Sequence, residues 1–338
     1  MEMQRYLWKQ ILVLALDATL CYFGIYSLPA YMPHLMHHLG VPITNVGYKV
    51  GAANNIIFAS AAVGTVVAGV LPSYISPKRL LVGSLCLKGF LCIFYGFSKS
   101  LTFLLISLAP MGLVGGVASV CINTVISNKC NESGQTYIMA WTVAGPTTVS
   151  AAFAPALAGY LSFPAENYPL LFSNTGVFKT YPILLFQMLI GGSLVLLSLI
   201  SYCSLDDECL CQDYDTQDPF PNTNYSILEE DITEDNIDDE SLDSTEKSKV
   251  KVFFNIILLN PCCIGALLGK ALFVACDVAY ISLVPLWLHT PRSSFGQNYN
   301  VNHVGNILII SGAMAALLSY TVLAKVNSMM DSKVVLVI

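Results

Sequence analysis

Residues 204–249 read SLDDECLCQDYDTQDPFPNTNYSILEEDITEDNIDDESLDSTEKSK and hold 16 of the 22 acidic residues of the chain. A segment of this composition cannot bury enough apolar surface to fold, so it predicts a solvated, disordered linker. The regions on both sides of it are strongly apolar. The linker is therefore predicted to divide a polytopic membrane protein into two halves.

The composition supports a membrane protein. The chain has 338 residues, of which 55% are hydrophobic and 11% charged, and outside the linker only six acidic residues remain. A soluble core of this size would carry more charge. The net charge of -6 belongs to the linker, so it gives no support for a nucleic-acid partner. The eleven cysteines lie mostly within or beside apolar segments, which predicts buried thiols and no disulfide framework.

Eight apolar segments approach the length of about 20 residues that crosses the hydrocarbon core. They are residues 10–33, 51–72, 80–97, 101–123, 137–161, 182–203, 262–288 and 304–324. A ninth begins at Val334. We therefore predict an all-α membrane bundle with a six-span N-terminal half (1–203), an acidic cytosolic linker (204–249) and a partial C-terminal half (250–338). The first segment lacks a small-residue cleavage site, so it is predicted to be a retained span.

The distribution of basic residues predicts the orientation. With a cytosolic N-terminus, the inner segments carry Arg5, Lys9, Lys78, Arg79, Lys129, Lys247, Lys249, Lys251, Lys325 and Lys333. The outer segments then carry Lys49, Lys99, Lys179 and Arg292. Because cytoplasmic loops are enriched in Lys and Arg, this excess favours a cytosolic N-terminus and a cytosolic linker.

Four ionisable residues lie deep in the predicted spans, namely Asp17, Lys88, Lys270 and Asp277. Each costs at least about 2.5–3.5 kcal/mol to insert, so each is expected to face the bundle interior or a cavity. Asp17 is either a proton or cation site or a carboxylate held by a neighbouring hydroxyl or backbone group. Lys88 is either a structural partner of another helix or a ligand contact. Lys270 and Asp277 are two helical turns apart and share a face, although Lys270 could instead reach the headgroups.

Two other groups of residues suggest helix–helix contacts. Asn54 and Asn55 are adjacent amides in the second span, where amides often bond to neighbouring helices. Small residues and prolines recur through the fifth span, including Gly145, Pro146 and the series from Ser150 through Pro155 to Gly159. We interpret this series as packing and hinge positions, because small side chains let helix backbones approach closely.

The sequence predicts neither a metal site nor a catalytic centre. His34 and His38 have the i, i+4 spacing of metal ligands, with His37 between them. However, Pro33 is expected to disturb this helix, and no nearby Cys or carboxylate completes a ligand shell. The motifs of phosphate-binding loops, serine hydrolases and zinc proteases are absent from the sequence. We therefore predict a protein that is not an enzyme and has no cofactor.

Several motifs resemble those of the major facilitator superfamily, and more narrowly of its zinc-induced facilitator-like branch, which is related to tetracycline-efflux proteins. Residues 47–51 (GYKVG) are similar to the Gly-aromatic start of the second span, and residues 164–169 (PAENYP) to a Pro-Ala-Glu-x-Tyr-Pro exit after the fifth. Residues 276–280 (CDVAY) and 304–312 (VGNILIISG) resemble the seventh and eighth spans. The small residues and prolines from Ser150 to Gly159 in the fifth span resemble a degraded form of the family's antiporter motif.

The chain also departs from the pattern of that family. In the loop that begins at Gly69, the family's Asp and Arg positions are Ser73, Tyr74 and Pro77, and the fourth span lacks the Arg of proton-coupled members. The resemblance implies secondary transport of a small solute by alternating access, with proton coupling as a further possibility. The departures favour an alternative, a transport-inactive scaffold or receptor that acts through the acidic linker.

The resemblance and the buried polar groups together give the candidate sites. The predicted solute- or proton-binding residues are Asp17, Asp277, Lys270, Tyr280, Asn54, Asn55 and Trp141. The predicted gating and packing residues are Gly69, Lys78, Arg79, Gly145, Pro146, Pro155 and Gly159. The expected partners are the lipid bilayer, a small solute of cationic character and protons. The expected location is the plasma membrane or a vacuolar or endolysosomal membrane.

Overall fold

The computed structural model describes residues 2–71, 74–129, 138–139, 142–143, 145–172, 176–205 and 261–318. Within these ranges every regular element is a helix, so the prediction of an all-α protein is confirmed. Most of the acidic linker (206–249) and the ninth predicted span (from Val334) lie outside the described residues.

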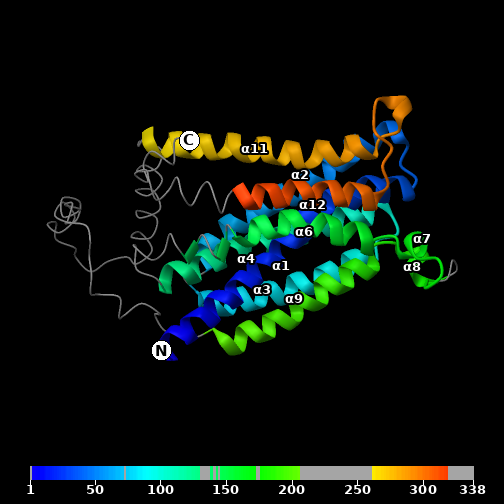
Figure 1. Cartoon of the computed structure of the whole chain (residues 1–338). Helices are drawn as coiled ribbons and strands as arrows, with labels where there is room; N and C mark the ends of the chain where they lie inside the picture. Colours follow the sequence, from blue (N-terminus) through cyan, green and yellow to red (C-terminus); the bar gives the residue numbers. More distant parts are fainter. Residues whose placement is uncertain are drawn as a thin grey trace, which may run out of the picture. The chain divides into compact units, whose positions relative to one another are not determined.

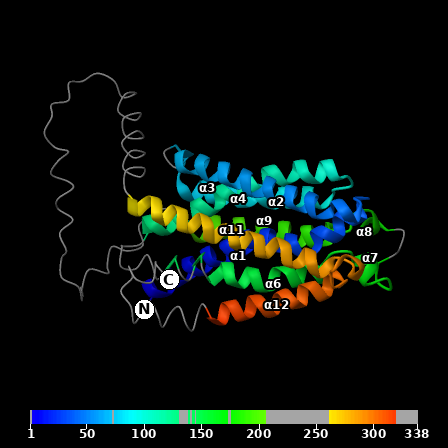
Figure 2. The same cartoon turned by 90° about the horizontal axis from the view of Figure 1, so that it is seen from above.

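Eight long helices form the described structure (Figures 1 and 2). They are α1 (Glu2–His38), α2 (Ile43–Val70), α3 (Pro77–Gly96), α4 (Leu101–Lys129), α6 (Gly145–Leu161), α9 (Leu184–Ser204), α11 (Pro261–His289) and α12 (Val301–Leu318). The short elements are α7 (Pro164–Asn167), α8 (Val177–Thr180) and the 3₁₀ turn η3 (Arg292–Ser294). Among the described helices, five are long and apolar enough to cross a membrane: α1, α2, α3, α4 and α9.

Helix α1 is longer than predicted. It continues through Pro29 and Pro33 to His38, so the expectation that Pro33 disturbs the helix before His34 is wrong. Proline removes one backbone hydrogen bond, but a helix tolerates it where neighbouring helices hold the chain in place. Such support is present, because Tyr31 and Leu35 on either side of Pro33 are fully buried in the core.

Close glycine contacts join the helices of the first half. A methyl group on Gly89 of α3 would lie 2.7 Å from the carbonyl oxygen of Gly191 in α9. On the other side of the bundle, Gly112 and Gly116 of α4 lie against the backbone of α2, and Gly64 of α2 lies against the backbone of α4. These backbones therefore approach too closely for any larger residue, as in membrane helix pairs built on small residues.

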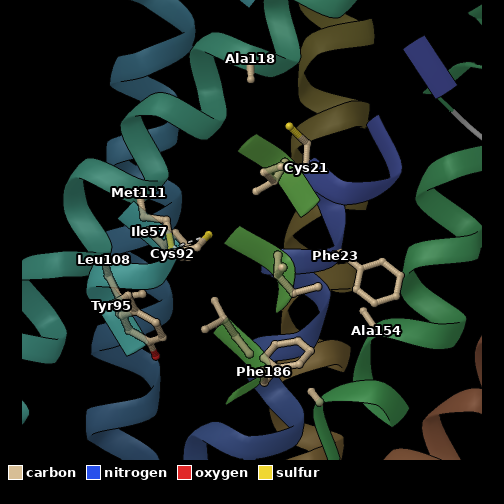
Figure 3. Packing of buried hydrophobic residues seen from close by; sticks show 14 of the residues in the cluster. Cys21, Phe23, Ile57, Cys92, Tyr95, Leu108, Met111, Ala118, Ala154 and Phe186 are labelled. Atoms are coloured by element: carbon tan, nitrogen blue, oxygen red, sulfur yellow. Dashed lines mark hydrogen bonds between the residues drawn. The ribbon is translucent and has the colours of Figure 1, made fainter. Parts of the chain in front are cut away.

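Apolar side chains fill the space between these helices (Figure 3). Cys92 and Tyr95 of α3 gather with Leu108 and Met111 of α4, and the sulfur atoms of Cys92 and Met111 lie 3.9 Å apart. Phe186 of α9 is also buried in this core. The side chains that cover the outside are apolar too, as expected where a bundle faces lipid.

Helix α6 lies between α1 and α12 in both views (Figures 1 and 2). Because α12 belongs to the predicted second half, this contact joins the two sets of spans. The short helices α7 and α8 lie at the end of the bundle opposite the N-terminus (Figure 1). We call this end the His34 end, because His34 lies in the last turns of α1 there.

Candidate functional site: buried charges and the α6–α12 contact

Asp17 lies inside the first half, between α1 and α9. Its side chain is 0% exposed, and the hydroxyl of Ser201 lies 2.9 Å from each of its two carboxylate oxygens. Among the described residues, Ser201 is its hydrogen-bond partner. One hydroxyl hydrogen serves two carboxylate oxygens, so the carboxylate has fewer donors than a buried negative charge usually has. The structure thus supplies the hydroxyl partner that one of the two sequence interpretations named.

Lys88 is a second buried ionisable residue in the same half. It comes from α3, is 2% exposed, and its Nζ donates a hydrogen bond of 2.8 Å to the backbone carbonyl of Cys21 in α1. Gly115 of α4 gives it room, since a methyl group there would lie 3.3 Å from the Lys88 Nζ. Among the described side chains, Lys88 and Asp17 do not form a direct ion pair with each other. The amine therefore ties α3 to the turn of α1 that follows Asp17.

The two amides of the second span have different surroundings. Asn54 is buried, and its Nδ2 donates a hydrogen bond of 2.8 Å to the hydroxyl of Ser282 in α11. Asn55 is exposed, because adjacent positions on a helix point about 100° apart. Asn54 therefore lies where α2 meets the last third of α11.

Among the other predicted solute-binding residues, Tyr280 is the one whose side chain the structure describes. Tyr280 is half exposed. The side chains of Lys270 and Asp277 lie outside the described residues, as does Trp141. The helix α11 that carries Lys270 and Asp277 is continuous from Pro261 to His289, so the two remain two helical turns apart.

The small residues of α6 form its contacts with α1 and α12. Pro146 and Pro155 are buried, and the hydroxyl of Ser150 donates to the carbonyl of Thr19 in α1 at 2.9 Å. A methyl group on Gly159 would lie 3.0 Å from the carbonyl oxygen of Val301 in α12. Gly145 is buried as well.

Glycines of α12 complete this contact from the other side. A methyl group on Gly305 would lie 3.0 Å from the carbonyl oxygen of Pro155, and Gly312 lies against Ala152. Small residues of both helices therefore lie where the backbones of α6 and α12 approach each other most closely.

The gate residues predicted from the loop after α2 have few contacts. Nothing lies within 4 Å of a methyl group built on Gly69. The Nζ of Lys78 lies 5.7 Å from the ring centroid of Tyr202, and Arg79 is exposed. Residue 73, where the sequence lacks the expected Asp, lies outside the described residues.

At the His34 end, the structure brings together residues that the sequence did not connect. The Nε2 of His34 lies 3.1 Å from the Oε2 of Glu166, a hydrogen bond that is also an ion pair when the imidazole is protonated. The ring of His289, at the end of α11, lies 5.3 Å from the ring of His34. Glu166 belongs to the PAENYP motif, which marked the segment but gave no role to this carboxylate.

No metal centre is formed in the described part of the chain. There, no three His, Cys, Asp or Glu side chains are arranged to hold an ion. His38 contacts the ring of Phe163 at 6.0 Å. His34 therefore lies beside an acidic and an aromatic side chain, and His38 beside an aromatic one.

Comparison with known proteins gives the family. The model of the Major Facilitator Superfamily matches residues 14–337, which is nearly the whole chain. The chain belongs to this superfamily. The resemblance read from the motifs is thereby confirmed, and the superfamily is one of membrane transporters, not enzymes. The protein is accordingly an integral multi-pass membrane protein.

Sequence relatives come from the branch named by the motifs. Zinc Induced Facilitator-Like 1 of Arabidopsis thaliana is 28% identical over 158 residues, which are 47% of this chain and 30% of the relative. Zinc Induced Facilitator 1 of the same plant is 28% identical over 160 residues, covering 47% and 31%. A probable peptide/nitrate transporter of Arabidopsis is 26% identical over 159 residues, covering 47% and 30%. The matched part thus spans about a third of these relatives.

Solved structures confirm the fold. A bacterial homologue of the human lysosomal transporter Spinster, in an inward-facing and unoccupied conformation, has a TM-score of 0.66. It is 13% identical, and the match covers 96% of this chain and 64% of that one. The occupied form of the homologue has a TM-score of 0.65 and is also 13% identical, covering 93% and 60%. The predicted bundle of the major facilitator type is confirmed.

Proposed function

We propose that this protein is a secondary transporter that moves a small solute across a membrane by alternating access. The observation that carries the proposal is the α6–α12 contact, in a chain that belongs to a transporter superfamily. This contact joins a helix of the first half to a helix of the second through small residues on both sides. Small sliding movements of packed helices are one of the ways in which the two parts of such a protein move against each other.

Asp17 is our candidate for the coupling site. A buried carboxylate with one hydroxyl donor has a high electrostatic cost, and binding a proton or a cation removes that cost. Its partner Ser201 lies in α9, so a change in the charge of Asp17 acts directly on the α1–α9 contact. A proton, or a small cation of the same charge, is therefore the proposed coupling ion.

For the solute pathway we propose the polar residues of α2 and α11. Asn54 bonds to Ser282 where these two helices meet. Asp277, Tyr280 and Lys270 precede Ser282 on α11 within about three and a half turns, and Asp277 would favour a cationic solute. Asn55 and Trp141 complete the proposed set. We further propose a cytosolic N-terminus, because the predicted inner segments carry more Lys and Arg than the outer ones. The proposed location is the plasma membrane or a vacuolar or endolysosomal membrane.

Flux measurements on the full-length natural protein in proteoliposomes test this proposal. A trapped pH-sensitive dye reports proton movement when small organic cations, divalent metal ions or organic acids are added in turn. The expected result is a change of internal pH with one solute class. Asp17→Asn should abolish this proton movement while solute exchange continues without a gradient. Unchanged proton movement in Asp17→Asn would remove Asp17 from the coupling mechanism.

A matched pair of serines in α9 sharpens the test. Ser201 bonds to Asp17, whereas the described hydrogen bond of Ser198 runs to the carbonyl of Val195 in its own helix at 2.7 Å. Ser201→Ala should change the pH dependence of flux, and Ser198→Ala should not. Asp277→Asn should abolish solute movement with the expression level intact. Absence of flux for every solute in the unmodified protein would instead favour the scaffold alternative.

A further inference from the structure

A cluster of titratable side chains closes the His34 end of the bundle. We define it as His34 of α1, Glu166 of α7 and His289 of α11, together with the backbone carbonyl of Tyr299. His34 lies 3.1 Å from Glu166, and the rings of His34 and His289 are perpendicular with centroids 5.3 Å apart. His34 and Glu166 belong to the first half and His289 to the second. The cluster therefore lies across the contact between the two sets of spans.

The hydrogen bonds fix which nitrogen of each imidazole carries a proton. The Nδ1 of His289 lies 3.0 Å from the carbonyl oxygen of Tyr299, and a carbonyl can only accept, so Nδ1 is the donor. The Nε2 of His34 donates in the same way to the ionised carboxylate of Glu166. The next proton on each ring is then added at Nδ1 of His34 and at Nε2 of His289. Water reaches the pair, since the side chains of His34 and Glu166 are 29% and 55% exposed.

The charges on the neighbouring elements are mostly positive when protonated. They are His37 and His38 of α1, Lys179 of α8, Arg292 of η3 and His303 of α12. Glu166 is the carboxylate in contact with the cluster. One carboxylate balances one protonated imidazole but not two. A second proton would place two positive charges on rings 5.3 Å apart, and like charges at this distance destabilise the arrangement that holds them.

The hydrogen bonds that join α6 and α7 to α12 at this end involve no histidine. Asn167 and Asn302 exchange amide hydrogen bonds of 3.3–3.5 Å, and the hydroxyl of Tyr160 donates to Asn306 at 3.0 Å. Amides and a neutral tyrosine keep their charge between pH 5 and 8, whereas histidine changes its charge in this range. A response of this end to pH in that range would therefore come from the histidines.

We propose that the cluster is a proton-binding latch, closed when at most one of its imidazoles is charged and released when both are. Release would separate the α11–α12 loop, with His289 and Tyr299, from the ends of α1 and α7. Protons on this side of the membrane would thus favour a state that is open toward them. The proposal rests on the proposed alternating access, because a latch has a role only if the two halves move.

Hydrogen–deuterium exchange of the full-length protein in lipid nanodiscs tests the latch without any solute. Exchange is compared at about pH 7.5 and about pH 5.5, the two sides of the histidine range, after correction for the intrinsic rate. Peptides that cover residues 160–168 and 287–303 should exchange about tenfold faster at the lower pH. This factor corresponds to about 1.4 kcal/mol in the equilibrium between the closed and released states. An equal rate at both pH values would overturn the proposal.

Two neutral variants preserve the hydrogen bonds but remove the titration. His289→Asn places an amide donor near the position of Nδ1, and His34→Gln places one near the position of Nε2. Both should stay closed at about pH 5.5, the acidic side of the histidine range. His303→Gln is the matched control, because the described ring contact of His303 is with Tyr299, at 6.1 Å, and this variant should respond as the unmodified protein does.

The outcomes separate the two proposals. If either His289→Asn or His34→Gln still responds to pH as the unmodified protein does, the latch is wrong, whatever flux measurements give. If only one variant folds, its response alone decides, since each removes one of the two charges. A latch that responds in a protein without flux would show that the transport proposal fails while the proton site stands.

Discussion

The α3–α9 contact and the α6–α12 contact both bring backbones together through glycine, but they differ in what surrounds the glycines. Gly89 and Gly191 of the first pair lie within one half, among buried apolar side chains. Gly159 of α6 and Gly305 of α12 form the second pair, which joins the predicted first half to the predicted second half. Hydrogen bonds from Tyr160 and Asn167 to Asn306 and Asn302 join α6 and α7 to α12 at the His34 end. We therefore expect the α3–α9 contact to stay closed and the α6–α12 contact to open from one end.

Enlarging Gly89 should have the largest effect. A valine there would collide with the carbonyl of Gly191 and with Val195, each 2.7 Å from the first added carbon. We expect Gly89→Val to lower stability by about 3 kcal/mol or more, so that little folded protein is recovered. Size-exclusion profiles and thermal unfolding in detergent provide the measurement.

Gly83 on the same helix is the control for that substitution. Nothing lies within 4 Å of a methyl group at this position. Gly83→Val should therefore give a normal yield of folded protein. Similar behaviour of the two variants would mean that the α3–α9 contact is not the fixed one.

Enlarging Gly305 should affect function more than folding. The first added carbon would lie 3.0 Å from the backbone of α6, a contact that a tilt of α12 relieves. We expect Gly305→Val to fold and to reduce flux about tenfold. Overpacking of about 1–3 kcal/mol would destabilise only the conformation in which α12 lies against α6.

Ile310 is the control on α12, because its side chain is largely exposed. Ile310→Val should leave both yield and flux unchanged. If Gly305→Val instead removes the folded protein as Gly89→Val is expected to do, the two glycine contacts are equivalent and the proposed difference disappears.

Removal of one tyrosine hydroxyl can be tested both inside the first half and at the α6–α12 contact. It should have the smallest effect on stability of the substitutions proposed here. Tyr31 is fully buried in the first half and accepts a hydrogen bond of 3.0 Å from the amide of Gln187, whereas Tyr160 donates to Asn306 at a more exposed position. Tyr31→Phe leaves a buried amide without its acceptor and should cost about 1–3 kcal/mol. Tyr160→Phe should cost about 0.5–1.5 kcal/mol, because water can replace its partner. The order of the two thermal unfolding temperatures checks this prediction, and the reverse order would contradict it.

The sequence was sufficient for the fold and for the chemical nature of several buried contacts. Apolar length located the helices, and the cost of a buried charge singled out Asp17 and Lys88 before either was placed. It could not supply Ser201, which is 184 positions from Asp17, or Glu166, which is 132 positions from His34. Such pairs depend on how the helices pack, and no periodicity along the chain encodes that. The prediction that Pro33 disturbs the helix failed for a related reason. Local propensity takes no account of the buried core around Tyr31 and Leu35.

The two prolines of α1 have a consequence for the way its ends move. Because proline has no backbone N–H, the carbonyls of Ile25 and Pro29 lack their usual partners at Pro29 and Pro33. Bending is easiest where such bonds are missing, and this stretch lies between Asp17 and His34. The packing of Tyr31 and Leu35 holds this stretch in the conformation described above. If the proposed proton sites at Asp17 and at the His34 end both act, the bend at these two prolines is where movement of one end of α1 would be taken up before it reached the other.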